Sequence, residues 1–281
     1  MGSLLSSLLY RIEAAVAAHK YPPAPVAQRL AVSADAAWDA AAPSFDHSAW
    51  DRALKRHVSP GGAVGGVRCA VVDYAALAAD PDVDAYRAAL AAADVDALPP
   101  NEQLALWMNA YNALCVGHVV RHMAAHGGAR PASVVDAKVG KLDVWDVDAG
   151  VVGGRAVTLT HVEHAVLRSR WAEPRVHACI NCASASCPDL RAEAFDARRL
   201  NAQMSEQAAR WMADDTKGAR RGEEGRVLTL SRVLLWFAPD FAPAGGAVAW
   251  AQQHAPTTAS TSSTARVDYF EYNWSLNDKS A

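Results

Sequence analysis

The segment RVHACINCASASCPDL, residues 175–190, concentrates side chains that can act as nucleophiles, bases or metal ligands. It contains one histidine, His177, and three cysteines, Cys179, Cys182 and Cys187, within a run of small residues. Thiolates bind metals, exchange with disulfides and attack electrophilic carbon, and imidazole titrates near neutral pH. The segment therefore allows three kinds of chemistry: a metal site, a redox pair or a cysteine nucleophile.

The first two alternatives have specific weaknesses. One histidine and three cysteines are enough to form a Cys₃His zinc site, but structural zinc sites usually join two separated ligand pairs. No second Cys-x-x-Cys pair occurs in the chain. A redox pair of Cys179 and Cys182 would normally open a helix after a strand, whereas here the pair is expected at the end of a strand. We therefore expect no resident metal or cofactor.

Cys187 is the preferred nucleophile, and Cys182 is the alternative. Pro188 follows Cys187, and proline is favoured at the first position of a helix, so Cys187 is expected at a helix N-cap. There the amide groups and the helix dipole would lower the pKa of the thiol and hold an oxyanion. The small residues before it, among them Ser186, would let a substrate approach the backbone closely.

The expected base is a histidine, either His177 or His164 in the segment THVEHAVLR. Imidazole is a common general base because it titrates near neutrality. Thr160 and Glu163 form the pattern of a capping box, which explains Glu163 by helix capping, although its carboxylate could also orient the imidazole. Arg168 lies one helical turn after His164 and is expected to bind a substrate carboxylate.

A long helix from Glu102 to about Ala125 must position these groups. It is apolar on every side over residues 104–120, which predicts a helix buried in the middle of the protein. Asn109 and Asn112 lie inside this apolar part, and a buried amide without partners costs about 1–3 kcal/mol. They either tie neighbouring loops to the helix, or Asn109 binds substrate and Asn112 orients the catalytic group.

The remaining pattern mixes helices and strands without a regular alternation. It predicts an α+β fold, a mostly helical single domain with a small, mainly antiparallel sheet around the buried central helix. Further helices are expected near residues 3–18, 25–41, 47–58, 80–93, 160–171, 198–213, 232–238 and 242–254, and strands near 67–72, 142–148, 154–159, 176–181, 226–231 and 267–278.

Composition shifts suggest how the chain is divided. The glycine-rich residues 59–66 predict a flexible joint between an N-terminal helical arm, residues 1–60, and a main domain, residues 61–281. The Ser/Thr-rich residues 255–265 predict a flexible loop within that domain. The helical arm is a candidate surface for a protein partner.

Charge and cysteine content exclude several classes of protein. The net charge is −3, so neither nucleic acid nor an anionic membrane is expected as a partner. No apolar run approaches the roughly 18 residues of a membrane span. Five cysteines without a secretory signal predict thiols in a reducing compartment, the cytoplasm. The opening MGSLLS fits the myristoylation pattern, which would place the protein on a membrane surface.

Five segments, taken together and in this order, resemble the DUF547 family, a domain of unassigned function, over about residues 67–277. They are VDYAAL, EQLALWMNAYNAL, LTHVEHAVLR, VHACINCASASCPDL and YNWSLN. The resemblance implies a fold but no established reaction, and it leaves Cys69, Cys115 and Cys179 outside the family pattern, which weakens the zinc and Cys-x-x-Cys hypotheses. It puts weight on Asn109, Asn112, Glu163, His164, His177, Cys182, Ser186, Cys187, Pro188, Trp274 and Asn277.

We therefore expect a cysteine-dependent hydrolase or acyl or amide transferase that acts on a small molecule or a peptide. Two alternatives from other classes remain open. One is a non-catalytic protein-interaction module that uses the N-terminal helices. The other is a metal-binding domain with His164, His177, Cys182 and Cys187 as ligands.

Overall fold

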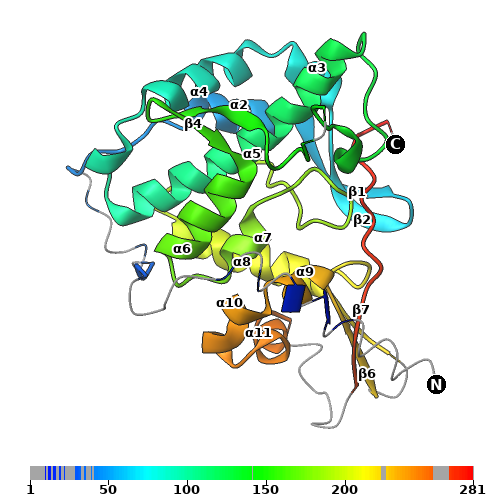
Figure 1. Cartoon of the computed structure of the whole chain (residues 1–281). Coiled ribbons are helices and arrows are strands. Elements are labelled where there is room, and N and C mark those ends of the chain that lie inside the picture. The colour runs from blue at the N-terminus through cyan, green and yellow to red at the C-terminus, as the bar shows by residue number, and fades with distance from the viewer. Residues whose placement is uncertain are drawn as a thin grey trace.

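The computed structural model describes residues 10, 12, 13, 15, 16, 19, 22, 29–32, 35, 39, 41–140, 142–222, 226–255 and 266–280. Helices dominate these residues (Figure 1). The helices are α2 (Ser48–His57), α3 (Tyr74–Ala78), α4 (Pro81–Ala92), η3 (Val95–Ala97), α5 (Pro100–Ala125), η4 (Val134–Asp136), the π-helical η5 (His161–Leu167), α6 (Arg168–Arg170), α7 (Val176–Cys179), α8 (Leu200–Ala213), α9 (Arg232–Trp236), α10 (Ala238–Phe241), η7 (Ala242–Ala244) and α11 (Ala247–His254). The strands are β1 (Val58–Val64), β2 (Val67–Val72), β3 (Asp148–Val152), β4 (Arg155–Thr158), β5 (Ala219–Arg221), β6 (Val227–Leu230) and β7 (Arg266–Tyr269).

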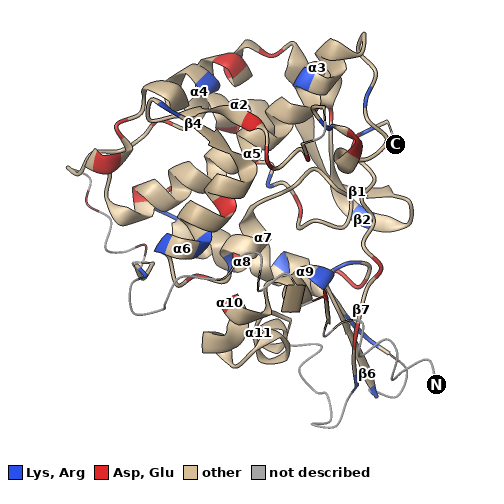
Figure 2. Ribbon diagram, in the orientation of Figure 1, with Lys and Arg blue, Asp and Glu red and all other residues tan. Residues whose placement is uncertain are grey.

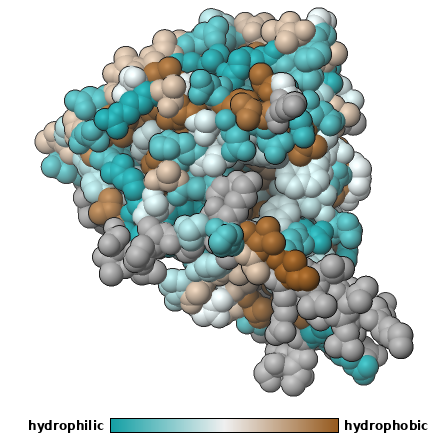
Figure 3. All heavy atoms as spheres, viewed as in Figure 1, coloured by the Kyte–Doolittle hydropathy of each residue, from teal (hydrophilic) through white to brown (hydrophobic). Residues whose placement is uncertain are grey.

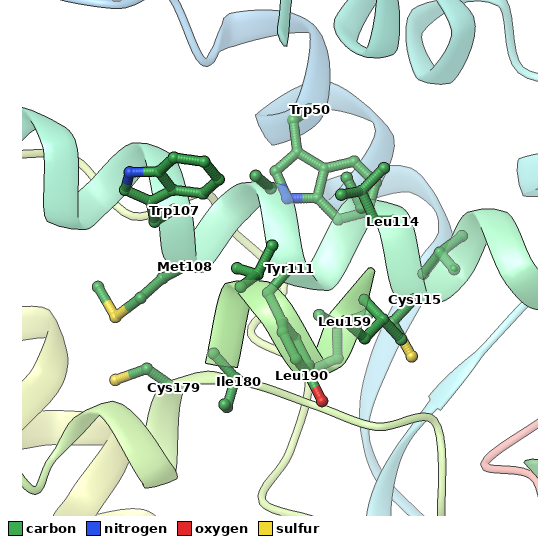
Figure 4. Packing of buried hydrophobic residues seen from close by; sticks show 14 of the residues in the cluster. Trp50, Trp107, Met108, Tyr111, Leu114, Cys115, Leu159, Cys179, Ile180 and Leu190 are labelled. Carbon is green, nitrogen blue, oxygen red and sulfur yellow. The ribbon is translucent and has the colours of Figure 1, made fainter. Parts of the chain in front are cut away.

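The long helix α5 runs through the middle of the molecule, and other elements surround it (Figure 1). Every side chain from residue 102 to residue 119 is buried, so the predicted central helix is confirmed. Trp50 of α2 packs on one side of α5, and Ile180 and Leu190 lie on the other (Figure 4). Each large apolar side chain buried in this way contributes about 1.5–3 kcal/mol, which explains why this helix organises the fold.

Three small sheets lie around the helices in the described residues. β1 with β2 and β3 with β4 form antiparallel hairpins, while β6 pairs antiparallel with β5 and parallel with β7. The predicted α+β class, mostly helical with mainly antiparallel strands around a buried helix, is therefore confirmed.

The flexible joint predicted at residues 59–66 is wrong. These residues form most of β1 and the hairpin turn, where Gly65 and Gly66 adopt the positive φ angles of 56° and 82° that the turn requires. Trp50 and Leu54 of α2 belong to the same buried cluster as α5. The described residues on both sides of position 60 therefore share one core, because the glycines serve a tight turn and not a linker.

Several local predictions differ from the structure. Residues 176–179, expected in a strand, form the short helix α7. The strand expected near 142–148 begins only at Asp148, and the helix expected at 232–238 is followed directly by a second one, α10. Leu30, expected in a helix, forms a parallel β-bridge with Trp171. In each case long-range contacts outweigh weak local preferences.

Parts of the N-terminal and loop predictions lie outside the described residues. Residues 10, 12, 13, 15 and 16 are helical, as expected, but the remainder of residues 3–18 and the MGSLLS motif are not described. The Ser/Thr-rich loop is likewise outside them from residue 256 to residue 265. Tyr10 donates a hydrogen bond to Asp268 at 2.8 Å, and Glu13 pairs with Arg232 at 3.0 Å, so this helix contacts β7 and α9.

The surface mixes residue types. Positive and negative side chains are interspersed along the described ribbon (Figure 2), and hydrophobic residues alternate with hydrophilic ones on the face in Figure 3. None of the helices in the described residues combines the length and the hydropathy needed to cross a bilayer.

Candidate functional site

A cavity of about 220 Å³ brings together residues that are far apart in the sequence, from Tyr111 to Trp274. Its walls come from α5, η5, α7, α9, the C-terminal segment and residues 180–188, which we call the cysteine loop. The cavity is lined by Tyr111, Asp143, Trp145, Asp146, Thr160, Glu163, His164, His177, Ile180, Cys182, Cys187, Pro188, Val233, Trp236, Phe237, Tyr272 and Trp274.

Buried amides attach the cysteine loop to the central helix. Asn112 donates from Nδ2 to the carbonyl of Cys179 at 2.9 Å and accepts at Oδ1 from the Asn181 amide at 2.8 Å. Asn181 in turn donates from Nδ2 to the carbonyl of Pro188 at 2.7 Å, which closes the loop at its base. Its Oδ1 accepts from the amide of Ala183, whose φ is 67°. Asn112 therefore positions the loop.

The C-terminal segment pairs with the same loop and explains the YNWSLN motif. The Ala185 amide donates to the carbonyl of Ser275 at 2.9 Å, and the Asn277 amide donates to the carbonyl of Ala183 at 3.0 Å. Asn277 also accepts a hydrogen bond from the buried Tyr74 hydroxyl at 2.7 Å. This pairing carries Tyr272 and Trp274 into the wall of the cavity.

A buried lysine holds the loop from its other side. Lys217 is only 2% exposed, and its Nζ donates to the carbonyl of Cys187 at 2.8 Å and to Asp189 at 2.5 Å. It follows α8, and a Cβ at Gly218 would lie 1.7 Å from a backbone oxygen of Trp211, so only glycine fits this turn. Lys217 could not be recognised from the sequence, because it lies in a short basic run typical of a solvated loop.

The helix expected to begin at Pro188 is wrong. The chain after Cys187 is irregular until α8 begins at Leu200, so no helix dipole acts on this thiol. The Cys187 sulfur lies 3.8 Å from the carbonyl oxygen of Ile180 and accepts a hydrogen bond from the Cys182 amide at 3.1 Å. Burial and the neighbouring Cys182 sulfur raise the pKa of Cys187. These surroundings favour the thiol form of Cys187 over the expected thiolate.

Cys182 has the opposite environment. Its sulfur lies 3.1 Å from the Ser184 hydroxyl and 3.5 Å from the Tyr272 hydroxyl. A hydrogen bond from the Cys187 thiol outweighs the effect of burial and, with those from Ser184 and Tyr272, lowers the pKa of Cys182 below that of a free thiol. Of the two cysteines in the cavity wall, Cys182 thus has the surroundings that favour a thiolate.

The capping box predicted for Thr160 and Glu163 is wrong. Thr160 is already helical and donates its hydroxyl to Asp146 at 2.6 Å, while the His161 amide is capped by the Thr158 hydroxyl at 3.0 Å. The helix widens to a π-helix here, a feature that often occurs at functional sites. Glu163 is therefore not used for capping, and its side chain faces the cavity.

The Glu163 carboxyl is unusual among the acids of the chain. It accepts a hydrogen bond from the Tyr111 hydroxyl of α5 at 3.2 Å. Burial raises the pKa of Glu163 to about 7, against the opposing effect of Arg168, and the negative Cys182 sulfur adds to the rise. A carboxyl with such a pKa exchanges protons near neutral pH.

Both candidate histidines line the cavity and hold defined partners. Arg168 donates to Nδ1 of His164 at 2.8 Å; because a guanidinium can only donate, the His164 ring carries its proton on Nε2. His177 stacks on Phe237 and binds Asp240 through Nε2 at 2.9 Å. Burial lowers the pKa of His177, although Asp240 opposes this.

Asp240 anchors this network. Its Oδ2 accepts from Arg168 Nε at 2.6 Å as well as from His177. Burial alone would raise the pKa of Asp240, but His177 and Arg168 hold it below the usual range. Sequence patterns gave no indication of Asp240, which lies between two prolines in the segment FAPDFAP.

The three residues expected to bind substrate have internal partners. Arg168 is 5% exposed and binds the carboxylate of Asp240. Asp240 thus takes the place that was expected for the carboxylate of a substrate. Asn109 exchanges two hydrogen bonds with the backbone of Phe195, at 2.8 and 3.0 Å. The Ser186 hydroxyl accepts from the Asn273 amide at 2.9 Å. None of the three lines the cavity. For Asn109 the contacts fit the structural alternative, in which the amide ties a neighbouring loop to the helix.

The chemistry of the cavity wall does not suggest a metal centre. Within the described residues, no three His, Cys, Asp or Glu side chains are grouped closely enough to hold a metal ion. His177 directs Nε2 to Asp240, and Cys187 is held as a thiol, which makes both poor ligands in this arrangement.

A comparison with protein families supports the resemblance. Residues 95–212 match the family described as "Protein of unknown function, DUF547". This segment is therefore similar to the DUF547 family. The DUF547 segment contains α5, η5 and the cysteine loop, whereas VDYAAL and YNWSLN lie outside the matched residues. No curated protein and no solved structure matches the chain.

Proposed function

We propose that this protein is a cysteine-dependent hydrolase or acyl or amide transferase whose nucleophile is Cys182. The observation that carries the proposal is the position of the Cys182 sulfur, in the wall of a cavity and among hydrogen-bond donors. The thiolate is the reactive form of cysteine, so donors that stabilise it increase the nucleophile present near neutral pH. In this proposal Cys187 acts as one of those donors.

The first step forms a bond between the Cys182 sulfur and the carbonyl carbon of the substrate. The carbonyl oxygen gains a negative charge in the tetrahedral intermediate. When the carbonyl re-forms, the bond to the leaving amine, alcohol or thiol breaks. Proton transfer to the leaving group comes from Glu163, whose pKa of about 7 suits both acid and base. The Glu163 carboxylate then removes a proton from water or from the acceptor, which attacks the acyl-cysteine and releases the thiolate.

Hydroxyl groups are the proposed stabilisers of the oxyanion. The amides of the cysteine loop already have acceptors: those of Ala183, Ala185, Ser186 and Cys187 donate to Asn181, Ser275, Asn273 and Ser184. Burial raises the pKa of Tyr272, so its hydroxyl keeps a proton to donate beside the sulfur. Donors preorganised in this way supply about 2.7–4 kcal/mol each in characterised acyl-transfer enzymes. His164, with its proton on Nε2, is a second donor in the same cavity.

The lining favours a compact acyl group of a small molecule or a peptide. Trp236, Tyr272 and Trp274 form a continuous aromatic wall, with ring centroids 4.4–5.7 Å apart. Such rings bind flat or apolar groups through contact area. A working thiolate also requires a reducing compartment, and we propose the cytoplasm.

Alkylation with iodoacetamide as a function of pH tests the nucleophile. We expect the full chain to be labelled at Cys182 well below the pH at which free cysteine reacts. Cys182→Ala should abolish this labelling, and Cys187→Ala should keep it but move it to higher pH because one donor is lost. Cys69→Ala, which removes a buried thiol outside the cavity, is the matched control and should change nothing. Labelling at Cys187 in place of Cys182 would refute the assignment.

Acyl transfer itself is tested with aryl esters and thioesters of small apolar acids. Mass spectrometry should detect an acyl group on Cys182, and Glu163→Gln should slow its release more than its formation. If Cys182 is labelled by iodoacetamide but no panel member ever acylates it, the transferase proposal fails.

A non-catalytic interaction module is the second candidate. Ile12 and Val16 lie one turn apart on the N-terminal helix and are 54% and 62% exposed, so they present two neighbouring aliphatic side chains to solvent. A partner could cover them. An inert Cys182 thiol would favour this function over the enzyme.

A further inference from the structure

Two sulfur atoms share one wall of the cavity. The amide of Cys182 donates to the Cys187 sulfur at 3.1 Å, so the Cys187 side chain lies against the backbone of Cys182. Both residues line the cavity, so a small solute that enters it reaches both. The other three cysteines, Cys69, Cys115 and Cys179, are 2–3% exposed and do not line it.

The loop holds the pair together from both ends. Asn181, directly before Cys182, donates to the carbonyl of Pro188, directly after Cys187, at 2.7 Å. Lys217 binds the carbonyl of Cys187 itself. A disulfide requires two Cα atoms within about 4.4–6.8 Å, and a clamp on the residues flanking the pair keeps the backbone segments close. The contact between the Cys182 amide and the Cys187 sulfur shows that the clamp brings the two residues against each other.

We propose that Cys182 and Cys187 form a peroxide-reactive dithiol that closes to an intramolecular disulfide. In the first step the Cys182 thiolate attacks a hydroperoxide: a sulfur–oxygen bond forms, the oxygen–oxygen bond breaks, and the alkoxide or hydroxide leaves and is protonated. In the second step the Cys187 sulfur attacks the sulfenic sulfur. The sulfur–sulfur bond forms, the sulfur–oxygen bond breaks, and the Cys187 proton leaves with the hydroxide as water. The dithiol loses two electrons, and the peroxide gains them.

The two thiols are suited to these different steps. Cys182 has donors that stabilise the attacking thiolate, whereas Cys187 keeps its proton until the sulfenic acid exists beside it. Redox-active cysteines typically combine an accessible thiolate with a resolving cysteine next to it. Closure does not depend on acyl transfer. Its use as regulation does rest on the proposed function, because the disulfide would remove the nucleophile until a dithiol reductant restores it.

The test uses the full chain, freed of reductant and treated with stoichiometric hydrogen peroxide, then denatured and alkylated with N-ethylmaleimide. We expect three alkylated cysteines in place of the five that are free in the reduced protein. Trypsin releases residues 176–191 as one peptide, which should be about 2 Da lighter and unalkylated at Cys182 and Cys187. Fragmentation of this peptide locates the bond without any variant, and dithiothreitol should reverse it.

Variants separate the possible pairings. Cys187→Ser should stop at a sulfenic acid that dimedone traps, and Cys182→Ser should give neither product. Cys179→Ser lies in the same peptide and is the matched control, which should still lose about 2 Da. Loss of closure in Cys179→Ser, a bond to Cys115, or direct oxidation of Cys182 to the sulfinic acid would each overturn the proposal. If the disulfide forms but Cys182 is never acylated, only the proposed function is refuted. If Cys182 is acylated but the disulfide does not form, only this inference is refuted.

Discussion

Replacing Glu163 by glutamine should change how the free energy of unfolding depends on pH, because the cavity wall perturbs the pKa of this carboxyl. The pKa of Glu163 is about 7 in the folded protein, compared with an ordinary value of 4.5. Between these two values the folded protein binds more protons than the unfolded chain, so the free energy of unfolding falls as the pH rises through this window. Glutamine has the same shape, keeps an acceptor for the Tyr111 hydroxyl and does not titrate.

The magnitude follows from the same two values. One unit of pKa corresponds to about 1.4 kcal/mol, so ionising Glu163 in the fold costs about 3 kcal/mol. Water in the cavity screens part of this cost, and we expect about 2 kcal/mol. At about pH 5 the variant and the wild type should differ little, whereas at about pH 8 Glu163→Gln should be about 2 kcal/mol more stable.

Urea denaturation at both pH values measures the difference. Other titrating groups, including His47 and His118, whose pKa values are lowered to about 4 and about 3 by burial, contribute equally to both proteins and cancel. Glu271→Gln removes a carboxylate at an exposed position and is the matched control. Its difference in free energy of unfolding from the wild type should be the same at both pH values. A stability difference between Glu163→Gln and the wild type that is the same at both pH values would refute the perturbed carboxyl and its proton-transfer role.

Three further predictions concern the support of the cysteine loop. Asn112→Ala and Asn109→Ala each lose two buried hydrogen bonds, and each should lower the free energy of unfolding in urea by about 2–4 kcal/mol. Only Asn112→Ala should also lower the alkylation rate of Cys182. An equal effect of both variants on that rate would contradict a positioning role for Asn112. Lys217→Met leaves buried acceptors unpaired and should cost about 3 kcal/mol by the same assay, and a cost under about 1 kcal/mol would show that the lysine is dispensable. Ala183→Gly relieves the φ of 67° and should be neutral or up to about 1 kcal/mol stabilising, whereas Ala185→Gly at an ordinary φ should lose about 1 kcal/mol; the reverse order of the two in thermal unfolding would contradict the strained backbone.

Patterns that are local in sequence predicted local structure well. The run of apolar residues on all sides of α5 required a buried helix, and the buried amides within it required partners, because burial of unpaired polar groups is costly. The helices α4 and α8 and the strand β2 were predicted within a few residues. Glycine runs and short apolar runs were less informative, since a hairpin turn and a flexible joint share the same composition, as residues 59–66 illustrate.

The candidate site was predicted as a set of residues but not as an arrangement. Cys182, Glu163, His164 and His177 do line one cavity, in agreement with the motifs that drew attention to them. The partners of Arg168, Asn109 and Ser186, which are Asp240, Phe195 and Asn273, could not be predicted. Nothing in a local segment shows which distant residue will pair with a buried polar group.

The sequence by itself determined the α+β class, the central helix and the short list of reactive side chains, since these follow from residue types and their spacing. Only the tertiary structure shows how differently the two cysteines are surrounded. A thiol pKa depends on the donors within a few ångströms of the sulfur, and one of those donors, Tyr272, is 90 residues from Cys182 in the chain. In the folded protein that hydroxyl lies next to Cys182, whereas no helix begins at Cys187. The contacts, and not the motif, therefore distinguish the two sulfurs.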